Sequence, residues 1–325
     1  MEMGRKYFFC VCALVLSTPL FSQDTSFIKK IKVPSFIDTL FIDRDLNNYS
    51  VRVFTNYKNS RFKFSSADEE ILYEPGNPAG IGFGVGSRKL ILDIAFNINP
   101  KDKEPTDRFD FQGTLMLNHH SIDFFLQSYH GYYLDYEDQE EFRGDISSFS
   151  TGINYLYLIN SEKFSLTAMK SGLSRQKKAA ASLGLGGFLY INQISADSTI
   201  VPPELVPEYD EEARLEKLLG IGAGLLVSLD AGIPIWKNFF AAVSFTPGIG
   251  LMYKSAVTES GSSHPGDPFI FQSNLSGIVG FNAKKLYINF NLGHIIYKTS
   301  LDFDYQIIYN TAHAKLALGY KFGKR

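Results

Sequence analysis

Residues 81–96 read IGFGVGSRKLILDIAF, and this stretch decides the fold. Its apolar residues occupy every second position: Ile81, Phe83 and Val85, then Leu90, Leu92, Ile94 and Phe96. The positions between them hold glycine or polar residues: Gly82, Gly84, Gly86 and Asp93. Successive side chains of a strand point to opposite faces, so the alternation predicts two strands that share one apolar face.

The same alternation recurs to the end of the chain. It predicts twelve strands, at about 78–87, 88–98, 107–118, 120–130, 147–158, 162–172, 178–191, 218–230, 236–252, 269–281, 284–297 and 311–323. They run to roughly 9–13 residues, whereas soluble strands usually have about 5–6. A tilted strand needs about 9–11 residues to cross a membrane.

A backbone in hydrocarbon must satisfy its hydrogen bonds internally, so strands that cross a membrane must close into a barrel. The expected fold is therefore all-β: an antiparallel transmembrane β-barrel of about 12 strands, with 10–14 possible, over residues 71–325. Hydrophobic residues make up 45% of the chain, yet they are dispersed by alternation. The pattern predicts a protein of the bacterial outer membrane in contact with its lipid.

Residues 1–23 have the features of an export signal. Arg5 and Lys6 precede a short apolar run that ends at Leu16, and cleavage is expected after Gln23. Cys10 and Cys12 leave with this segment, so the mature chain has no cysteine. It keeps 30 basic and 33 acidic residues, a balance that argues against a nucleic-acid partner.

Residues 24–70 are expected to form an N-terminal periplasmic segment. Within it, residues 51–64 suggest a β-hairpin with its turn near Asn59 and Ser60, either as an appendage or as part of a larger barrel. The predicted strand order places the acidic stretch 134–145 at the periplasmic end, where turns are normally short.

The polar face of the strands should line the lumen. Its expected lining residues are Asp93, Asp110, Gln112, Asn289, Asn291 and Lys315. Glycines share this face, among them Gly82, Gly84, Gly220, Gly222 and Gly224. They could open space for a solute, admit a plug such as residues 24–48, or relieve crowding as the strands curve.

His119 and Ser121 form the one candidate for catalysis. They lie two residues apart on one face of a strand, a spacing that resembles the His–Ser pair of outer-membrane lipid hydrolases. The alternation turns both toward the lumen, and no third residue is evident to orient the histidine. The sequence indicates no metal site and no cofactor.

Tyr320 and Phe322 alternate in the last strand. This aromatic–x–aromatic ending looks like the signal read by the barrel-assembly machinery, although Gly323, Lys324 and Arg325 follow it. We therefore expect a transient interaction with that machinery during biogenesis.

Four stretches resemble a family of Gram-negative outer-membrane proteins known only as a domain of unknown function. They are ILYEPGNPAGIGFGVGSRKLILDIAF (71–96), FRGD (142–145), KFSLTA (163–168) and RQKKAAASLGLGGF (175–188). The resemblance covers roughly residues 25–323, with Gly76 inserted in the Tyr73–Pro75–Asn77 motif. It implies the barrel and the compartment, and it brings no active site.

Three functions follow as hypotheses. The first is a non-enzymatic narrow pore or carrier that passes small solutes through the polar lumen. The second is a structural or interaction barrel with a closed lumen, acting through loops 192–217 and 253–268. The third is a lipid hydrolase that uses His119 and Ser121.

Overall fold

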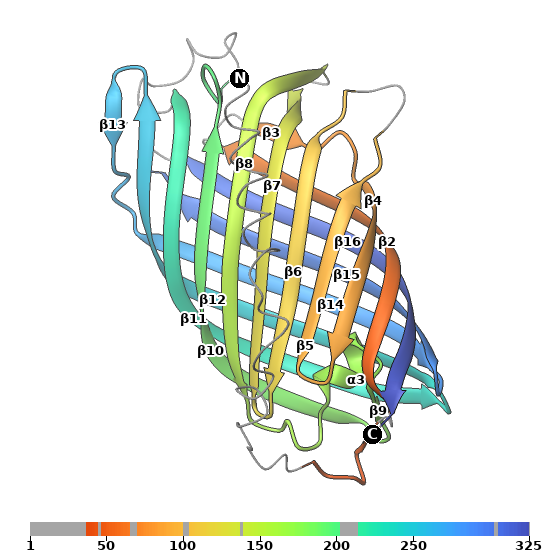
Figure 1. Cartoon of the computed structure of the whole chain (residues 1–325). Coiled ribbons are helices and arrows are strands. Elements are labelled where there is room, and N and C mark those ends of the chain that lie inside the picture. Colours follow the sequence, from red (N-terminus) through yellow and green to blue (C-terminus); the bar gives the residue numbers. More distant parts are fainter. Residues whose placement is uncertain are drawn as a thin grey trace, which may run out of the picture. The chain divides into compact units, whose positions relative to one another are not determined.

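The computed structural model describes residues 37–44, 47–65, 70–99, 104–136, 139–201, 214–301 and 305–324. Twelve strands in this part pair antiparallel in a closed ring (Figure 1). They are β2 (Asn47–Ser65), β4 (Ala79–Ser87), β5 (Leu90–Asn97), β6 (Asp107–Leu117), β7 (His120–Tyr136), β8 (Gln139–Leu158), β10 (Ala180–Ser195), β11 (Leu215–Trp236), β12 (Phe239–Thr258), β14 (Phe269–Asn282), β15 (Leu286–Ser300) and β16 (Gln306–Lys324). Each pairs with the next along the chain, and β16 closes the ring on β2. The fold is an antiparallel β-barrel, as the sequence predicts.

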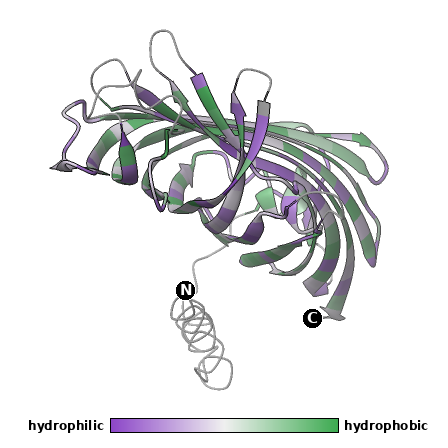
Figure 2. Cartoon of the chain, turned by 90° about the horizontal axis from the view of Figure 1, so that it is seen from above, coloured by the Kyte–Doolittle hydropathy of each residue, from purple (hydrophilic) through white to green (hydrophobic). Residues whose placement is uncertain are grey.

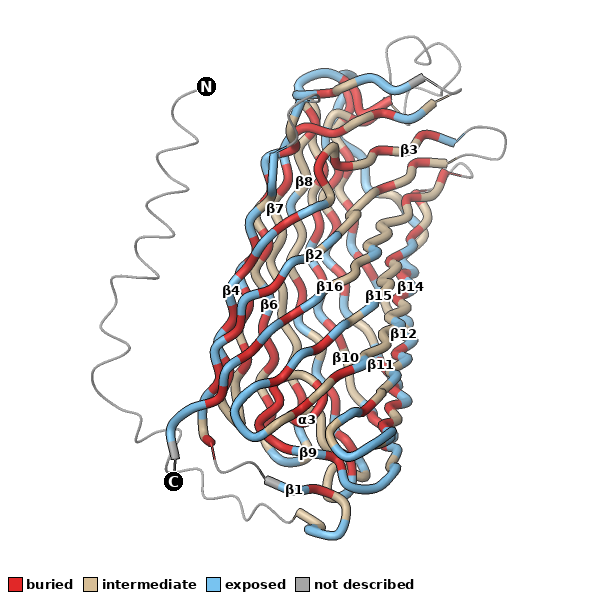
Figure 3. The backbone as a smooth tube through the Cα atoms, turned by 90° about the vertical axis from the view of Figure 1, so that its right-hand side faces the viewer, coloured by how far each residue is buried: buried red, intermediate tan, exposed pale blue. Residues whose placement is uncertain are grey.

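The outer surface of the barrel is apolar. Phe83 is 58% exposed, Leu225 72% and Phe290 43%, although each is a large hydrophobic side chain. The residues between them are buried, so buried and exposed positions alternate along the tube of Figure 3, and hydropathy alternates along the strands of Figure 2. Such an apolar face suits contact with lipid. None of the helices in the described residues has the length and hydropathy to cross a bilayer.

The two ends of the barrel differ in their connections. We call the end where β2 begins and β16 finishes the inner end, and the opposite end the outer end; Tyr49 pairs with Phe322 at the former. The turns at 88–89, 118–119, 237–238 and 283–285 lie at the inner end and are short. Longer connections, such as 98–106 and 259–268, lie at the outer end, where β13 (Gly261–Ser263) also pairs with β12.

The predicted hairpin at 51–64 was wrong, because β2 runs through Asn59 and Ser60 without a turn. Asn59 pairs with Ala312 and Ser60 with Thr311, within an unbroken ladder. The barrel therefore begins at Asn47, and this stretch is wall rather than appendage. Ser60 imitates a turn residue here because it faces the lumen of the barrel.

The predicted strand at 162–172 was also wrong. This stretch holds the short helix α3 (Leu166–Lys170), whose N-cap Ser165 accepts a hydrogen bond from the backbone N–H of Ala168 at 3.1 Å. The helix belongs to a 21-residue inner connection, 159–179, which also contains β9 (Ser174–Gln176). β9 pairs with β1 (Ile42–Arg44), and the three elements lie together at the inner end (Figure 3).

With residues 51–64 counted as a wall strand and residues 162–172 removed from the wall, each loop is assigned to the correct end of the barrel. The number of wall strands stays at twelve, but the acidic stretch 134–145 now lies at the outer end, around the tip of the β7–β8 hairpin. The prediction that placed it at the inner end was wrong because residues 51–64 were left out of the strand sequence. The expected signal peptide at 1–23 and most of the segment 24–48 lie outside the described residues.

The wall narrows toward the outer end. β4, β5 and β6 are short, and beyond them the single strand β3 (Glu70–Glu74) bridges β2 and β7. A bulge at Gly131, where φ is +82°, shifts the register of β7 just where its partner changes from β6 to β3. Near the outer end, β3 alone therefore takes the place of β4, β5 and β6 between β2 and β7.

Candidate functional site

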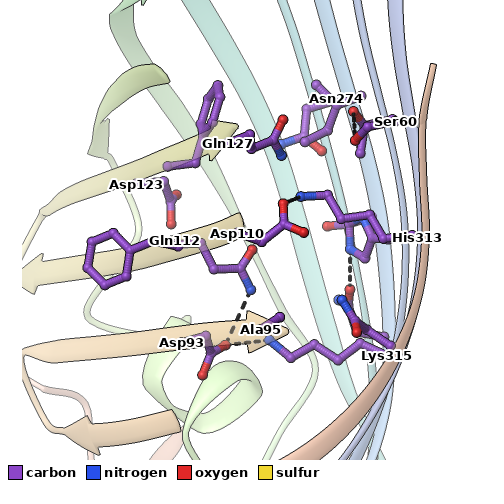
Figure 4. Close-up of a pocket in the computed structure, with 18 of the residues that line it drawn as sticks. Ser60, Asp93, Ala95, Asp110, Gln112, Asp123, Gln127, Asn274, His313 and Lys315 are labelled. Carbon is purple, nitrogen blue, oxygen red and sulfur yellow. Dashed lines mark hydrogen bonds and ion pairs between the residues drawn. The ribbon is translucent and has the colours of Figure 1, made fainter. Parts of the chain in front are cut away.

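A cavity of about 300 Å³ occupies the middle of the lumen. Side chains from β2, β5, β6, β7, β8, β10, β14, β15 and β16 line it, and Met169 and Lys170 of α3 form part of its inner boundary (Figure 4). All six residues expected in the lumen lie in its wall: Asp93, Asp110, Gln112, Asn289, Asn291 and Lys315. We call this cavity the chamber.

Asp93 on β5 binds two cations. The Nη2 and Nε atoms of Arg52 both lie 2.7 Å from Asp93 Oδ1, and Lys315 pairs with Oδ2. Gln112 donates to the same Oδ2 from 3.3 Å (Figure 4). The ammonium group of Lys315 also lies 4.1 Å from the ring centroid of Phe54.

Asp110 on β6 repeats this arrangement nearer the outer end. Lys58 pairs with Oδ1, and Arg108 Nε lies 3.3 Å from Oδ2. The hydroxyl of Tyr129 donates to Oδ1 at 2.9 Å. Arg108 also donates to the backbone carbonyls of Lys58 and Pro78, at 3.0 and 3.1 Å.

The other side of the chamber is uncharged. It presents the amides Gln127, Asn154, Asn192 and Asn274, together with Ser148, Ser150 and Ser276. Tyr190 stacks on Tyr297 with ring centroids 3.9 Å apart, although their strands β10 and β15 are not neighbours in the wall. The chamber therefore has a charged side, built on β2, β5, β6 and β16, and an amide and aromatic side.

The connection 159–179 closes the chamber at the inner end. Wall side chains hold its backbone: Arg52 donates to the carbonyl of Lys170 at 2.8 Å, and Asn289 to that of Met169 at 3.0 Å. Asn282 donates to the carbonyls of Gly172 and Ser174, at 3.0 and 2.8 Å. We call residues 159–179 the inner plug.

Side chains of the inner plug fasten it as well. Lys170 Nζ pairs with Asp123 on β7 at 2.8 Å. Phe164 and Met169 pack against Phe240 on β12. The inner plug is thus tied to opposite parts of the wall.

An apolar cluster closes the outer end. Seventeen buried residues form it, including Phe62 of β2, Ile71 and Tyr73 of β3, Tyr132 of β7 and Ile200 of the following loop. The rings of Phe62 and Tyr73 stack with centroids 4.8 Å apart, and the Tyr73 hydroxyl donates to the carbonyl of Ile200. We call this cluster the outer cap.

A polar contact holds the loop that follows β10 over the outer cap. Arg143 binds Asp145 through two hydrogen bonds of 2.8 Å. Both residues precede Phe149, the first strongly exposed apolar residue of β8, and so lie outside the lipid-facing part of the strand. Arg143 also donates to the carbonyl of Thr199 at 2.9 Å. This hydrogen-bonded guanidinium holds the pKa of the Asp145 carboxyl below its ordinary value.

The lumen glycines are covered by neighbouring side chains rather than left open. A Cβ on Gly82 would lie 2.2 Å from the ring of Phe54, and one on Gly319 would lie 2.1 Å from the ring of Tyr287. Large rings thus lie flat against the wall where glycine makes room. Of the three explanations offered by the sequence, the structure supports relief of crowding at these positions.

His119 and Ser121 lie near the inner end without a hydrogen bond between them. His119 sits in the β6–β7 turn, where its Nδ1 atom lies 2.8 Å from Ser161 Oγ and 3.2 Å from the carbonyl of Leu158. Ser121 is 1% exposed, and its hydroxyl has no hydrogen-bond partner. Tyr320 and Phe322 face outward near the inner end, 45% and 42% exposed.

Sequence reasoning missed Arg52 and Lys58, because it placed residues 51–64 outside the barrel. Their spacing carried a usable signal: Arg52, Phe54, Asn56 and Lys58 alternate with apolar or neutral residues as one face of a strand does. It also missed Lys170 as a chamber residue, because the inner plug was taken for a wall strand.

Comparisons with known proteins found one family and several solved structures. A family model described as a domain of unknown function (DUF4421) matches residues 36–322. No curated protein matches the sequence. Among solved structures, the outer-membrane protease OmpT of Escherichia coli is similar over 85% of this chain and 97% of its own, at 7% identity and a TM-score of 0.39.

Two autotransporter domains are similar to a comparable extent. The β domain of the Bordetella autotransporter BrkA matches over 85% of this chain and 99% of its own, at 11% identity and a TM-score of 0.36. The transport unit of AIDA-I from Escherichia coli covers 96% and 97%, at 10% identity and a TM-score of 0.35. These likenesses concern the fold alone, and no activity is transferred from them.

Proposed function

The chain belongs to the DUF4421 family, whose function is unknown, and from that premise we propose that it is a non-enzymatic carrier for small polar solutes in the bacterial outer membrane. The observation that supports this proposal most directly is the chamber between two closures. Its volume of about 300 Å³ lies at the lower end of the range of roughly 300–1,000 Å³ that small-molecule sites occupy.

The closures favour a carrier over a permanently open pore. In the described residues, the inner plug and the outer cap both fill the lumen with side chains or backbone. We infer that a solute reaches the chamber when one of them moves. The inner plug is one connection, held by single hydrogen bonds, one ion pair and the packing of Phe164 and Met169, and we assign the movement to it.

A closed-lumen interaction barrel is the second candidate, supported by the same two closures. It differs from the carrier in one respect, because its inner plug never leaves the lumen during function.

Conductance in a planar bilayer tests the proposal. The refolded mature protein should show rare, brief current steps. A variant in which residues 160–178 are replaced by a two-residue turn, like the other inner turns, should conduct continuously. A wild-type protein that conducts continuously would make it an open pore, and a silent replacement variant would favour the closed interaction barrel.

The lipid-hydrolase hypothesis has a separate test. Because His119 is engaged with Ser161 and the Ser121 hydroxyl is buried, we expect no lipid hydrolysis by the refolded protein. Release of fatty acid that is lost in a Ser121→Ala variant would overturn the non-enzymatic assignment.

A further inference from the structure

The charged side of the chamber contains more cations than carboxylates. Asp93 binds both Arg52 and Lys315, and Asp110 binds both Lys58 and Arg108. Asp123 pairs with Lys170 alone. Arg61, which also lines the chamber, is paired with Glu74. Within the described residues these contacts leave two positive charges without a carboxylate.

Three of the cations that share Asp93 and Asp110 lie close together. Arg52 and Lys58 are on the lumen face of β2, and Lys315 is on the neighbouring strand β16, opposite Asn56. Lys315 thus lies between the levels of Arg52 and Lys58, and the side chains of Lys58 and Lys315 are only 12% and 14% exposed. The four cations share only two carboxylates, so the buried group keeps a net positive charge. Such a charge is costly, and an anion entering the chamber would gain free energy there.

The uncharged side of the chamber determines what the rest of a ligand, apart from its anionic group, must be like. Asn192 is 2% exposed, and its Oδ1 atom has no hydrogen-bond partner; Oδ1 of Asn56, beside Lys315, also has none. The stacked rings of Tyr190 and Tyr297 lie on the same side as Asn192. A body with a flat or hydrogen-bonding surface fits this side, and the volume of about 300 Å³ limits it to a small molecule.

We propose that the chamber binds a small organic anion, with its carboxylate or phosphate group against Lys58 and Lys315 and its uncharged body toward Asn192 and the tyrosine pair. This inference names the solute class of the carrier and rests on that proposal only in requiring that solutes reach the chamber.

Equilibrium binding to the refolded mature protein tests the inference. The probes are benzoate, its uncharged analogue benzamide, inorganic phosphate and chloride, titrated in a calorimeter. Benzoate or phosphate should bind, and benzamide should bind at least tenfold more weakly, because it lacks the charge. Binding of chloride alone would overturn the organic part of the assignment, and equal binding of benzoate and benzamide would overturn the anionic part.

Two substitutions alter the charge balance in different ways. Lys315→Met removes one cation, and Gln112→Glu adds one carboxylate beside Asp93 with little change of shape. Both should weaken binding of the anion at least tenfold. Lys298→Met removes a lysine that is exposed on the outside of β15, and it should leave the affinity unchanged. Wild-type affinity in a folded Gln112→Glu variant would contradict the inference, even if Lys315→Met failed to fold.

The two proposals can fail separately. If neutral solutes pass through the protein but anions do not bind, the carrier proposal stands and the anion proposal fails. Anion binding in a chamber whose plug never opens would make the site a permanent part of a closed barrel.

Discussion

The two closures of the barrel differ in chemistry. The outer cap is an apolar cluster of seventeen buried residues from several strands and loops, with stacked aromatic rings. The inner plug is one connection, and wall side chains hold its backbone carbonyls through single hydrogen bonds. Apolar burial contributes to the stability of the whole fold, whereas each such hydrogen bond contributes about 0.5–1.5 kcal/mol and can break alone. On this comparison, the cap belongs to the core, and the plug is the part that we propose to move.

The largest effect is expected in the outer cap. Tyr73 is fully buried between Phe62 and the loop at Ile200. Tyr73→Ala should lower the free energy of unfolding by about 3–5 kcal/mol, because it leaves a cavity in the cluster. Tyr73→Phe, which keeps the ring, should lower it by about 1–3 kcal/mol through the unpaired carbonyl. Denaturant unfolding in detergent measures both, and an unchanged midpoint in Tyr73→Ala would show that the cap is not part of the core.

The inner plug should respond in permeability rather than stability. Gly172 has φ of +68°, and a Cβ there would lie 2.8 Å from the ring of Tyr287. Gly172→Ala should therefore displace the plug and raise bilayer conductance at least tenfold, while the unfolding midpoint shifts little because the wall ladders stay intact.

Gly277→Ala is the matched control for this substitution. Its new Cβ meets only one backbone oxygen, at 4.0 Å, so both conductance and midpoint should stay at the wild-type level. A Gly172→Ala variant with a lowered unfolding midpoint and no conductance would show that the inner plug is part of the core. The two ends of the barrel would then not differ in the way described.

The smallest effect concerns the contact between Arg143 and Asp145 over the outer cap. Because the pKa of Asp145 is lower in the folded state, its contribution to stability is present above the ordinary carboxyl pKa of about 4 and is lost as the pH falls through the folded value. The Asp145 side chain is partly exposed, at 22%, so the contribution should be less than about 1 kcal/mol. Asp145→Asn should lower the unfolding midpoint slightly at pH 7, and the difference from wild type should shrink as the pH falls below about 4. A difference that grows on acidification would contradict this sign.

Much of the wall could be predicted from sequence, because the alternation of Ile81, Phe83 and Val85 is a local property of a lipid-facing strand. The chamber was partly predictable for the same reason, since Asp93 and Lys315 occupy the polar positions of clear strands. Their pairing with each other was not, because it joins residues 222 positions apart.

Two stretches misled the sequence reasoning for a physical reason. Asn59 and Ser60 suggested a turn because both are polar, but Ser60 is polar because it lines the lumen in mid-strand. Phe164, Leu166 and Ala168 alternate like a strand, but Ser165 caps a helix and Gly172 follows its end with positive φ. Both end signals are present in the sequence and outweigh an alternation of only three residues.

Access to the chamber tests the central claim most directly. Residues 24–325 contain no cysteine, so in a chain that begins at Asp24, Ser276→Cys places a single thiol in the chamber wall and Ser263→Cys a single exposed thiol in β13. We would measure their reaction with iodoacetamide by mass spectrometry, with and without replacement of residues 160–178 by a short turn. The account predicts that the chamber thiol reacts at least tenfold more slowly than the exposed thiol in the intact protein, and nearly as fast once the plug is replaced. Equal rates for the two thiols in the intact protein, or a chamber thiol that stays slow without the plug, would contradict it.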